Sequence, residues 1–286
     1  MEDRSQKSRS EFASLVAART KGRNPAIERA FASVRREAFA GPGPWSIAKL
    51  DAAGYVRTPN DDPAHLYQDV VIALDPVRNL NIGLPSGHAI WLDAIDVKAG
   101  DHVVQVGAGT GYYTAILAHL VGGAGRVDAF EIEPDFADRA AENLRHLPHV
   151  KLHPRSGLAG DLPNADLIYV CVGTTQPYQA WLDAMRPGAR LLFPMQPDQG
   201  AGGMLLIRRP DDQTRDWPAR FLSRSRFTCC EGPRDAVAGS RLAEAFSSGW
   251  REVRSFRVGS ASDDTSWFAG DGWWLSTEAI DAGGSI

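Results

Sequence analysis

Cysteine is scarce in this chain of 286 residues, and long apolar runs are missing from it. Three cysteines, of which Cys229 and Cys230 are adjacent, cannot build a disulfide scaffold and fit a reducing compartment. No apolar run approaches the roughly 20 residues that a membrane-spanning helix needs. Segment 1–12 is polar and lacks the apolar core of a secretory signal. These absences predict a cytoplasmic protein without a membrane segment.

A strong charge of one sign is also missing. The net charge is −4, which argues against nucleic-acid binding through bulk charge. Residues 1–40 carry nine Lys or Arg and five Asp or Glu, a local excess of +4 that leaves −8 for the rest. This basic start is either a solvated helix or an arm for an anionic partner. Hydrophobic residues at 43% and charged residues at 23% are typical of a globular chain.

Strands and helices alternate along most of the chain. Helical spacing of apolar residues first appears over 24–38, a short apolar strand follows at 70–74, and four helices are predicted at 86–97, 112–120, from 133 onward and 178–185. Strands are predicted at 102–106, 127–131, near 151, 165–172, 189–194, 204–208 and 221–229. This order predicts an α/β fold with a doubly wound, mostly parallel sheet of seven strands.

The two ends of the chain read differently from this middle part. We expect an N-terminal helical region over 1–80, a core over 81–235 and a β-rich extension over 236–286. The extension holds Trp250, Trp267, Trp273 and Trp274. It is read as one or two extra strands, or as a flap packed on the core.

The clearest local signal is a glycine loop that follows the strand at 102–106. Gly107, Gly109 and Gly111 stand where a buried strand turns into a helix. Glycines allow a sharp turn and a close ligand, and a helix N-terminus offers free N–H groups. Glu131 ends the next strand, where its carboxylate can accept hydrogen bonds from both ribose hydroxyls of an adenosine.

The spacing of the glycines discriminates between adenosine ligands. A dinucleotide fingerprint places a small residue where this chain has Tyr112. The loop therefore favours S-adenosyl-L-methionine, which has no pyrophosphate, over a nicotinamide dinucleotide. A plain strand-to-helix turn with a surface Glu131 is the structural alternative. His146, His149 and His153 have a loosely metal-like spacing, but no Cys or carboxylate set completes them, so a zinc site is not expected.

Three stretches resemble the protein-L-isoaspartate (D-aspartate) O-methyltransferase family. They are NPAIERAFASVRREAF at 24–39, GAGTGYYTAILAHLVG at 107–122 and ADLIYVCVGTTQPYQAWLDAMRPGARLLFPM at 165–195. The resemblance runs from about Asn24 to Arg234, and the middle stretch is its most specific part. It implies a Rossmann-like fold, S-adenosyl-L-methionine as the cofactor and a carboxylate of a protein or peptide as the methyl acceptor. The implied cofactor contacts are Gly107, Ala108, Gly109, Thr110, Gly111, Tyr112, Glu131, Ile132, Ser156, Gly157 and Val172.

Departures from the family's pattern concern the acceptor side. Where the family has a Thr-Ile-Ser-x-Pro segment lining the reaction site, this chain has Asn81, Ile82, Gly83, Leu84 and Pro85. Threonine thus becomes Asn81 and the serine becomes Gly83. The family's Gly-Asp-Gly becomes Arg155-Ser156-Gly157, so that Ser156 replaces an aspartate that contacts adenine. About fifty residues extend past the family's usual end.

The acceptor decides which catalytic groups are needed. A carboxylate is ionised at pH 7 and needs no general base, whereas an amine or hydroxyl acceptor needs one. Asn81 can bind an acceptor carboxylate or close a turn. His88, His65 and Asp69 are the candidate bases near Gly83. His88 is alternatively a histidine at the surface or at the helix N-cap.

Three hypotheses follow: a family-like carboxylate methyltransferase, a methyltransferase for another small-molecule or peptide acceptor, and a non-catalytic cofactor-binding module. The oligomeric state, monomer or dimer, stays open.

Overall fold

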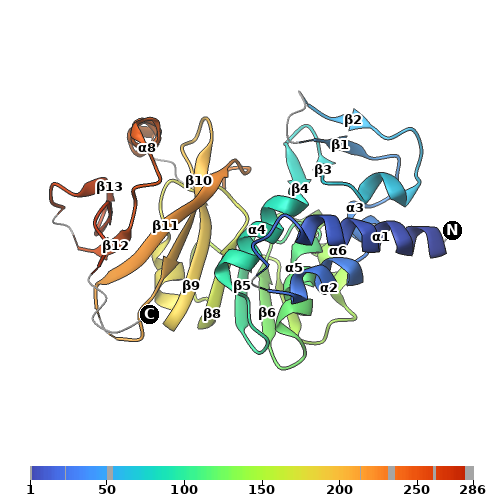
Figure 1. Ribbon diagram of the computed structural model, residues 1–286, viewed down its shortest axis with the longest axis horizontal. Coiled ribbons are helices and arrows are strands. Elements are labelled where there is room, and N and C mark those ends of the chain that lie inside the picture. Colours follow the sequence, from blue (N-terminus) through green and yellow to red (C-terminus); the bar gives the residue numbers. More distant parts are fainter. Residues whose placement is uncertain are drawn as a thin grey trace. The chain divides into compact units, whose positions relative to one another are not determined.

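The computed structural model describes residues 2–22, 24–49, 54–212, 214–230, 236–259 and 262–280 (Figure 1). The end of the family resemblance at Arg234 and the predicted domain boundary at 235 lie outside these residues. The chain divides into two units, Met1–Gly157 and Leu158–Ile286.

The first unit contains most of the helices. They are α1 (Glu2–Ala17), α2 (Ala26–Ser33), α3 (Arg36–Ala40), the 3-10 helix η1 (Pro63–Leu66), α4 (Pro85–Ile95), α5 (Tyr112–Val121) and α6 (Pro134–Leu144). Its strands are β1 (Ser46–Ala48), β2 (Val56–Arg57), β3 (Val71–Asp75), β4 (Leu80–Ile82), β5 (His102–Val106), β6 (Arg126–Phe130) and β7 (Val150–His153). The single helix predicted over 24–38 is two helices, because Val34 and Arg35 have extended backbone angles.

Two sheets form in this unit. Strands β2, β1, β3 and β4 pair antiparallel in that order. Strands β5, β6 and β7 pair parallel, with Val106 opposite Phe130 and Phe130 opposite His153. The carboxyl ends of β5 and β6 therefore meet at one edge of the sheet, where open α/β sheets place their ligands.

Helix α5 is apolar on all sides and buried along almost its whole length. It packs against α2, and α1 packs against α2 and α4 (Figure 1). Arg36 of α3 is fully buried, where its guanidinium donates to the carbonyls of Leu66, Gln68 and Val70. The N-terminal helices are thus part of the core around α5, and Arg36 holds the segment that leads into β3.

The second unit is richer in strands. Its elements are β8 (Ala165–Val170), α7 (Gln179–Ala184), β9 (Met185–Met195), β10 (Gly202–Arg208), β11 (Asp216–Ser225), α8 (Ala236–Ser248), β12 (Ser255–Val258), β13 (Ser266–Gly270) and β14 (Trp273–Ser276). Strands β8 and β9 pair parallel. The ladders β9–β10, β10–β11, β11–β12, β12–β14 and β13–β14 are antiparallel.

The α/β class and the extra β-rich segment are confirmed, although the sheet is more mixed than a mostly parallel one. Helix α8 was not predicted, because glycine, serine and alanine separate its few buried apolar residues, Leu242 and Phe246. Within the described residues, no helix is long and apolar enough to cross a membrane.

Candidate cofactor and acceptor site

The glycine loop joins β5 to α5 at the carboxyl edge of the parallel strands. Gly107, Gly109 and Gly111 have φ angles of 80°, 57° and 96°, a region that side chains with a Cβ rarely adopt. A Cβ on Gly111 would also lie 2.9 Å from Leu144 Cδ1 of α6. The predicted glycines are therefore required by the backbone path itself.

Glu131 follows β6 directly and turns toward this loop. Its carboxylate accepts hydrogen bonds from the backbone N–H of Gly109 at 2.6 Å and of Glu133 at 2.9 Å. The side chain is 6% exposed, and burial raises the pKa of its carboxyl despite these bonds. A carboxylate held beside a glycine loop can accept hydrogen bonds from the two hydroxyls of a ribose.

Two further predicted contacts lie near the ends of the same strands. Ile132 is an apolar side chain that is 44% exposed next to Glu131. A Cβ on Gly157 would lie 2.9 Å from Val106 Cγ2 and 3.0 Å from Phe130 Cβ, so this backbone runs directly over β5 and β6. Ser156 is half-buried beside it. The loop, the carboxylate and the exposed apolar side chain together fit an adenosine-bearing cofactor.

Other predicted loop residues connect the loop to the N-terminal helices. Thr110 is buried, and its hydroxyl donates to Phe39 O at 2.8 Å. The Tyr112 ring packs edge-on against Phe31 and Phe39. Ala108 is buried, and its N–H donates to Phe130 O at 3.1 Å. These side chains fix the loop's position.

The side chain of His88 occupies the space that a side chain at position 83 would fill. A Cβ on Gly83 would lie 2.5 Å from His88 Nε2 and 3.2 Å from its Cδ2, closer than side-chain carbons approach. His88 is 2% exposed and is neither at the surface nor at the N-cap, which is Leu84. Burial, and then the charge of Arg36, lower the pKa of His88 to about 3. A neutral imidazole thus fills the position where a side chain of residue 83 would begin.

Tyr113 connects this pair to the glycine loop. Its ring stacks on the His88 imidazole, with centroids 3.5 Å apart and planes 8° apart. Its hydroxyl donates to Gly83 O at 2.7 Å. Because Tyr113 follows Gly111 by two residues, Gly83 and His88 lie close to the loop. Asn81 lies on β4, where its amide donates to Asn79 O at 3.1 Å.

Sequence reasoning did not single out Leu74, and it offered Asp69 only as a candidate base near Gly83. Leu74 Cδ1 of β3 lies 3.8 Å from the position of a Cβ on Gly109, so β3 packs on the loop. Asp69 accepts from the Ser86 N–H at 2.9 Å in the first turn of α4. The apolar strand was predicted, but no sequence signal showed what it packs against. Val172, in the second unit after β8, stays a predicted contact.

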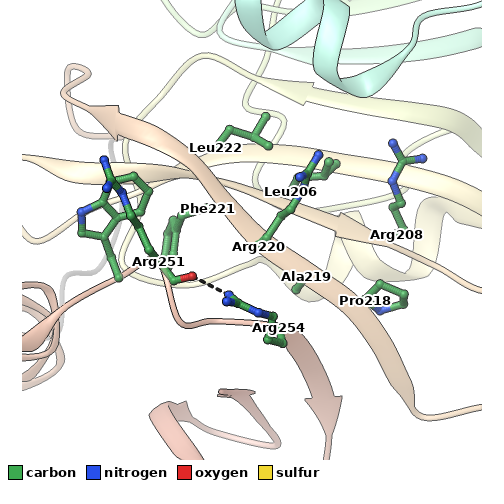
Figure 2. A pocket seen from close by; sticks show the side chains of 10 residues that line it. Leu206, Arg208, Pro218, Ala219, Arg220, Phe221, Leu222, Arg251 and Arg254 are labelled. Atoms are coloured by element: carbon green, nitrogen blue, oxygen red, sulfur yellow. Dashed lines mark hydrogen bonds between the residues drawn. The ribbon is translucent and has the colours of Figure 1, made fainter. Parts of the chain in front are cut away.

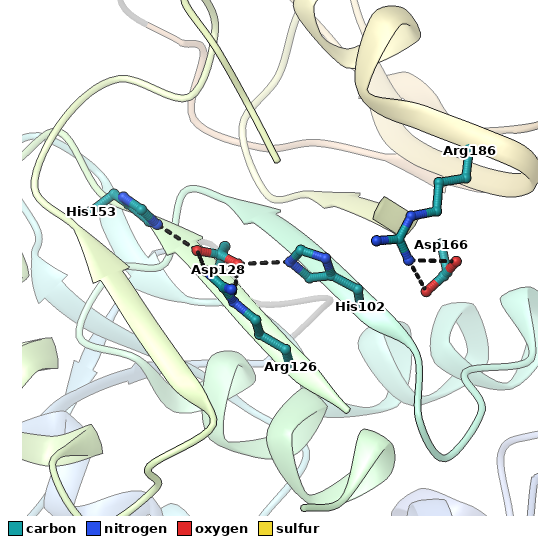
Figure 3. A network of polar contacts seen from close by, with 6 residues as sticks. All are labelled: His102, Arg126, Asp128, His153, Asp166 and Arg186. Atoms are coloured by element: carbon teal, nitrogen blue, oxygen red, sulfur yellow. Dashed lines mark hydrogen bonds and ion pairs between the residues drawn. The ribbon is translucent and has the colours of Figure 1, made fainter. Parts of the chain in front are cut away.

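A network around Asp128 links the three parallel strands (Figure 3). Asp128 of β6 is fully buried and accepts from His102 Nε2 at 2.7 Å and His153 Nε2 at 2.6 Å. Arg126 Nε lies 2.7 Å from the same carboxylate. Burial alone would raise the pKa of Asp128, but these bonds outweigh it and hold the pKa well below its usual range. Across the described ranges, no cluster of His, Cys, Asp or Glu side chains could hold a metal ion.

Comparisons with known proteins agree with this geometry. The family model described as Protein-L-isoaspartate(D-aspartate) O-methyltransferase matches residues 13–219. A protein-L-isoaspartate O-methyltransferase of Methanopyrus kandleri is 28% identical over 187 residues, which cover 58% of this chain and 81% of that protein. One of Methanocella arvoryzae is 32% identical over 141 residues, which cover 48% of this chain and 74% of that protein.

Solved structures show the same fold. A protein-L-isoaspartate O-methyltransferase structure has a TM-score of 0.63 at 18% identity and covers 95% of this chain and 88% of its own. A Plasmodium falciparum structure in complex with S-adenosyl-L-homocysteine has a TM-score of 0.58 at 16% identity, covering 78% and 98% respectively.

Proposed function

We propose a substrate and a set of site residues from one premise: this chain belongs to the protein-L-isoaspartate (D-aspartate) O-methyltransferase family. It is an S-adenosyl-L-methionine-dependent methyltransferase. The proposed acceptor is the side-chain carboxylate of an isoaspartyl residue in a protein or peptide. The family match over residues 13–219 is the observation that carries this proposal.

The first unit supplies most of the proposed cofactor contacts. Glu131 accepts hydrogen bonds from the ribose hydroxyls of S-adenosyl-L-methionine. The loop from Gly107 to Gly111 lies under the amino-acid end of this cofactor, and Ile132 packs on its adenine. Ser156 and Gly157 border the adenine from the following loop. The buried carboxylate beside the N–H of Gly109 and the exposed Ile132 support these roles.

The chemistry is an in-line displacement. When bound, S-adenosyl-L-methionine supplies a methyl group on a positively charged sulfur. One acceptor carboxylate oxygen forms the new bond to carbon as the carbon–sulfur bond breaks, which leaves a methyl ester and S-adenosyl-L-homocysteine. No proton moves, because the carboxylate is already ionised at pH 7. The protein's task is positioning, which contributes roughly 7–11 kcal/mol in well-oriented reactions.

Asn81, Gly83 and His88 form the proposed acceptor side. The His88 imidazole lies where the side chain of residue 83 would start, and Tyr113 holds both the ring and the Gly83 carbonyl. With its pKa lowered to about 3, the imidazole is neutral at pH 7 and suits a hydrogen-bonding role better than a cationic one. Asn81 offers an amide to the acceptor carboxylate.

The direct test is tritiated methyl transfer to an isoaspartyl peptide and to its aspartyl counterpart. We expect methylation of the isoaspartyl peptide alone. Binding of S-adenosyl-L-methionine by calorimetry, with no transfer to either peptide, would contradict the proposed acceptor. Transfer to other acceptors would then support the second hypothesis, a methyltransferase for another small-molecule or peptide acceptor. The observation that favours it is that the His88 imidazole fills the space that a side chain at position 83 would occupy. Binding without any transfer would support a non-catalytic module.

A substitution pair tests the role of Gly83. We expect Gly83→Ser to clash with the stacked imidazole and to destabilise the protein by about 1–3 kcal/mol, the usual effect of overpacking. Adding His88→Ala removes the obstacle and should restore stability relative to Gly83→Ser. Thermal unfolding and methyl transfer measured on the two variants and the unmodified chain decide this. Equal stability of Gly83→Ser and the unmodified chain would contradict the steric argument.

The proposed compartment is the cytoplasm. Cys171, Cys229 and Cys230 form no disulfide, which is usual for a reducing compartment. A protein substrate in that compartment is the proposed partner.

A further inference from the structure

A cavity of about 570 Å³ in the second unit is lined by four arginines (Figure 2). Arg208 and Arg220 come from the β10–β11 ladder, and Arg251 and Arg254 from the segment between α8 and β12. We name this cavity, with its four arginines, the arginine groove. Its described lining contains no aspartate or glutamate.

The strand pairing puts two of these arginines on one face. Leu206 of β10 stands opposite Arg220 of β11. Because side chains alternate along a strand, Arg208 shares the face of Leu206. Leu206 is 2% exposed and lies beside these guanidinium groups as an apolar floor.

Backbone hydrogen bonds hold the other wall. Arg254 O accepts from Ala219 N at 3.0 Å, and Arg254 N donates to Ser276 O at 2.8 Å. Trp250 packs edge-on against Phe221, with centroids 6.3 Å apart. The segment that carries Arg251 and Arg254 is therefore fixed against β11 and β14.

The charges of this groove are only partly compensated. Arg220, Arg251 and Arg254 are exposed, and in the described part of the chain no carboxylate lies within ion-pair distance of any of the three. Guanidinium groups keep their charge at every ordinary pH. Several of them around one cavity create a positive potential that attracts carboxylates and binds them in a bidentate manner.

We propose that the arginine groove binds an acidic segment of the polypeptide substrate. The proposal rests on the proposed function, since it concerns a polypeptide that carries the methylated residue. Leu206 and Trp250 give such a segment apolar contacts between its charges. A long nucleic acid fits less well, because Glu252 stands exposed beside Arg251 and the chain's net charge is −4.

The test compares two isoaspartyl peptides of one sequence, one with a tail of four glutamates and one with a tail of four glutamines. KM for methyl transfer is measured with the unmodified chain and with the groove variant Arg220→Gln/Arg251→Gln/Arg254→Gln. A control variant, Arg29→Gln/Arg215→Gln/Arg226→Gln, removes the same charge from exposed arginines that do not line the groove. Circular dichroism verifies that all three proteins are folded.

We expect KM of the unmodified chain to be roughly tenfold lower for the glutamate tail, as three exposed ion pairs allow. The groove variant should bring this ratio close to one, and the control variant should preserve it. Equal loss in both variants, or a ratio near one in the unmodified chain, would overturn the proposal.

Two further measurements separate this proposal from its premise. If the unmodified chain methylates neither peptide, the proposed function fails. Fluorescence anisotropy with the aspartyl form of the glutamate-tailed peptide then tests the groove alone, and equal binding by chain and groove variant would overturn it. A single-stranded oligonucleotide of equal charge serves as competitor. Tighter groove-dependent binding of the oligonucleotide than of the peptide would also contradict an acidic polypeptide as the occupant.

Discussion

Glu131 is the proposed ribose-binding residue, and its carboxylate lies beside the glycine loop. We expect Glu131→Gln to weaken S-adenosyl-L-methionine binding about 10- to 100-fold, since hydrogen bonds to a charged group contribute about 1.5–3 kcal/mol. Calorimetric titration measures the change. Glu133→Gln is the matched control, because Glu133 lies two residues away and pairs with Arg78 instead. Equal losses in the two variants would remove the special role of Glu131.

The pH dependence of binding belongs to the same residue. Burial raises the pKa of Glu131, so its carboxylate takes up a proton at a higher pH than an exposed glutamate does. As the pH is lowered, we therefore expect cofactor affinity to begin to fall at a pH higher than the ordinary pKa of glutamate.

His88 predicts a second pH effect, on folding. Its pKa is about 3 in the folded protein and about 6.5 in the unfolded chain, so between these values only the unfolded chain binds the proton. Stability should therefore rise with pH across this window, and at pH 5 His88 should cost about 2 kcal/mol. Urea unfolding at pH 5 and pH 7 measures the difference, which should shrink in His88→Phe. An undiminished difference in that variant would contradict this assignment.

Sequence reasoning found Glu131 and the glycines but not the relation between Gly83 and His88. A glycine loop after one strand and an acidic residue after the next strand can be recognised from short stretches of the sequence. The distance from a missing Cβ to an imidazole five residues later depends on how α4 packs on Tyr113. The sequence named both residues, and only the packing shows that they compete for one space.

At the scale of elements, Asp128 connects β5, β6 and β7 through His102, Arg126 and His153 (Figure 3). Replacing the carboxylate with Asp128→Asn weakens its hydrogen bonds to two half-buried histidines and one exposed arginine and should cost about 1.5–3 kcal/mol. Because the pKa of Asp128 is lowered in the folded protein, its stabilisation is complete above about pH 4 and is lost as pH falls further.

Chemical denaturation of this variant and the unmodified chain between pH 2 and pH 7 checks both points. Asp166→Asn is the control, since Asp166 forms an exposed pair with Arg186. A gap between Asp128→Asn and the unmodified chain that stays constant below pH 4 would contradict the titration argument.

Elements with one dominant pattern were predictable. Strand β5 has the predicted bounds, 102–106, because four of its five residues are buried and the turn residues Gly100 and Gly107 flank it. Helix α8 was missed because only Leu242 and Phe246 give it a buried apolar face. Strands β1, β2 and β4 are two or three residues long, too short for a periodic pattern.

At the scale of the whole molecule, we propose a helical region over 1–80, a methyltransferase core over 81–235 and an extension over 236–286. Strand β12 of the extension pairs with β11, placing Phe256 opposite Trp217. Phe246 and Trp267 pack on Phe221. We expect the extension to complete the fold of the second unit.

Truncation after residue 235 tests this expectation. The shortened chain should lose soluble expression or unfold at a clearly lower temperature, because the edge of β11 and the Phe221 ring become exposed. Phe246→Ala should act in the same direction by about 3 kcal/mol. Val237→Ala, at an exposed position of α8, should not. An unchanged melting temperature after truncation would make the extension an independent addition.

The shared space of Gly83 and His88 also couples the two positions. A histidine at 88 in the present orientation needs residue 83 to have no Cβ. Any substitution that adds a side chain at 83 therefore meets the imidazole, so that position 83 tolerates a larger residue only when position 88 changes with it.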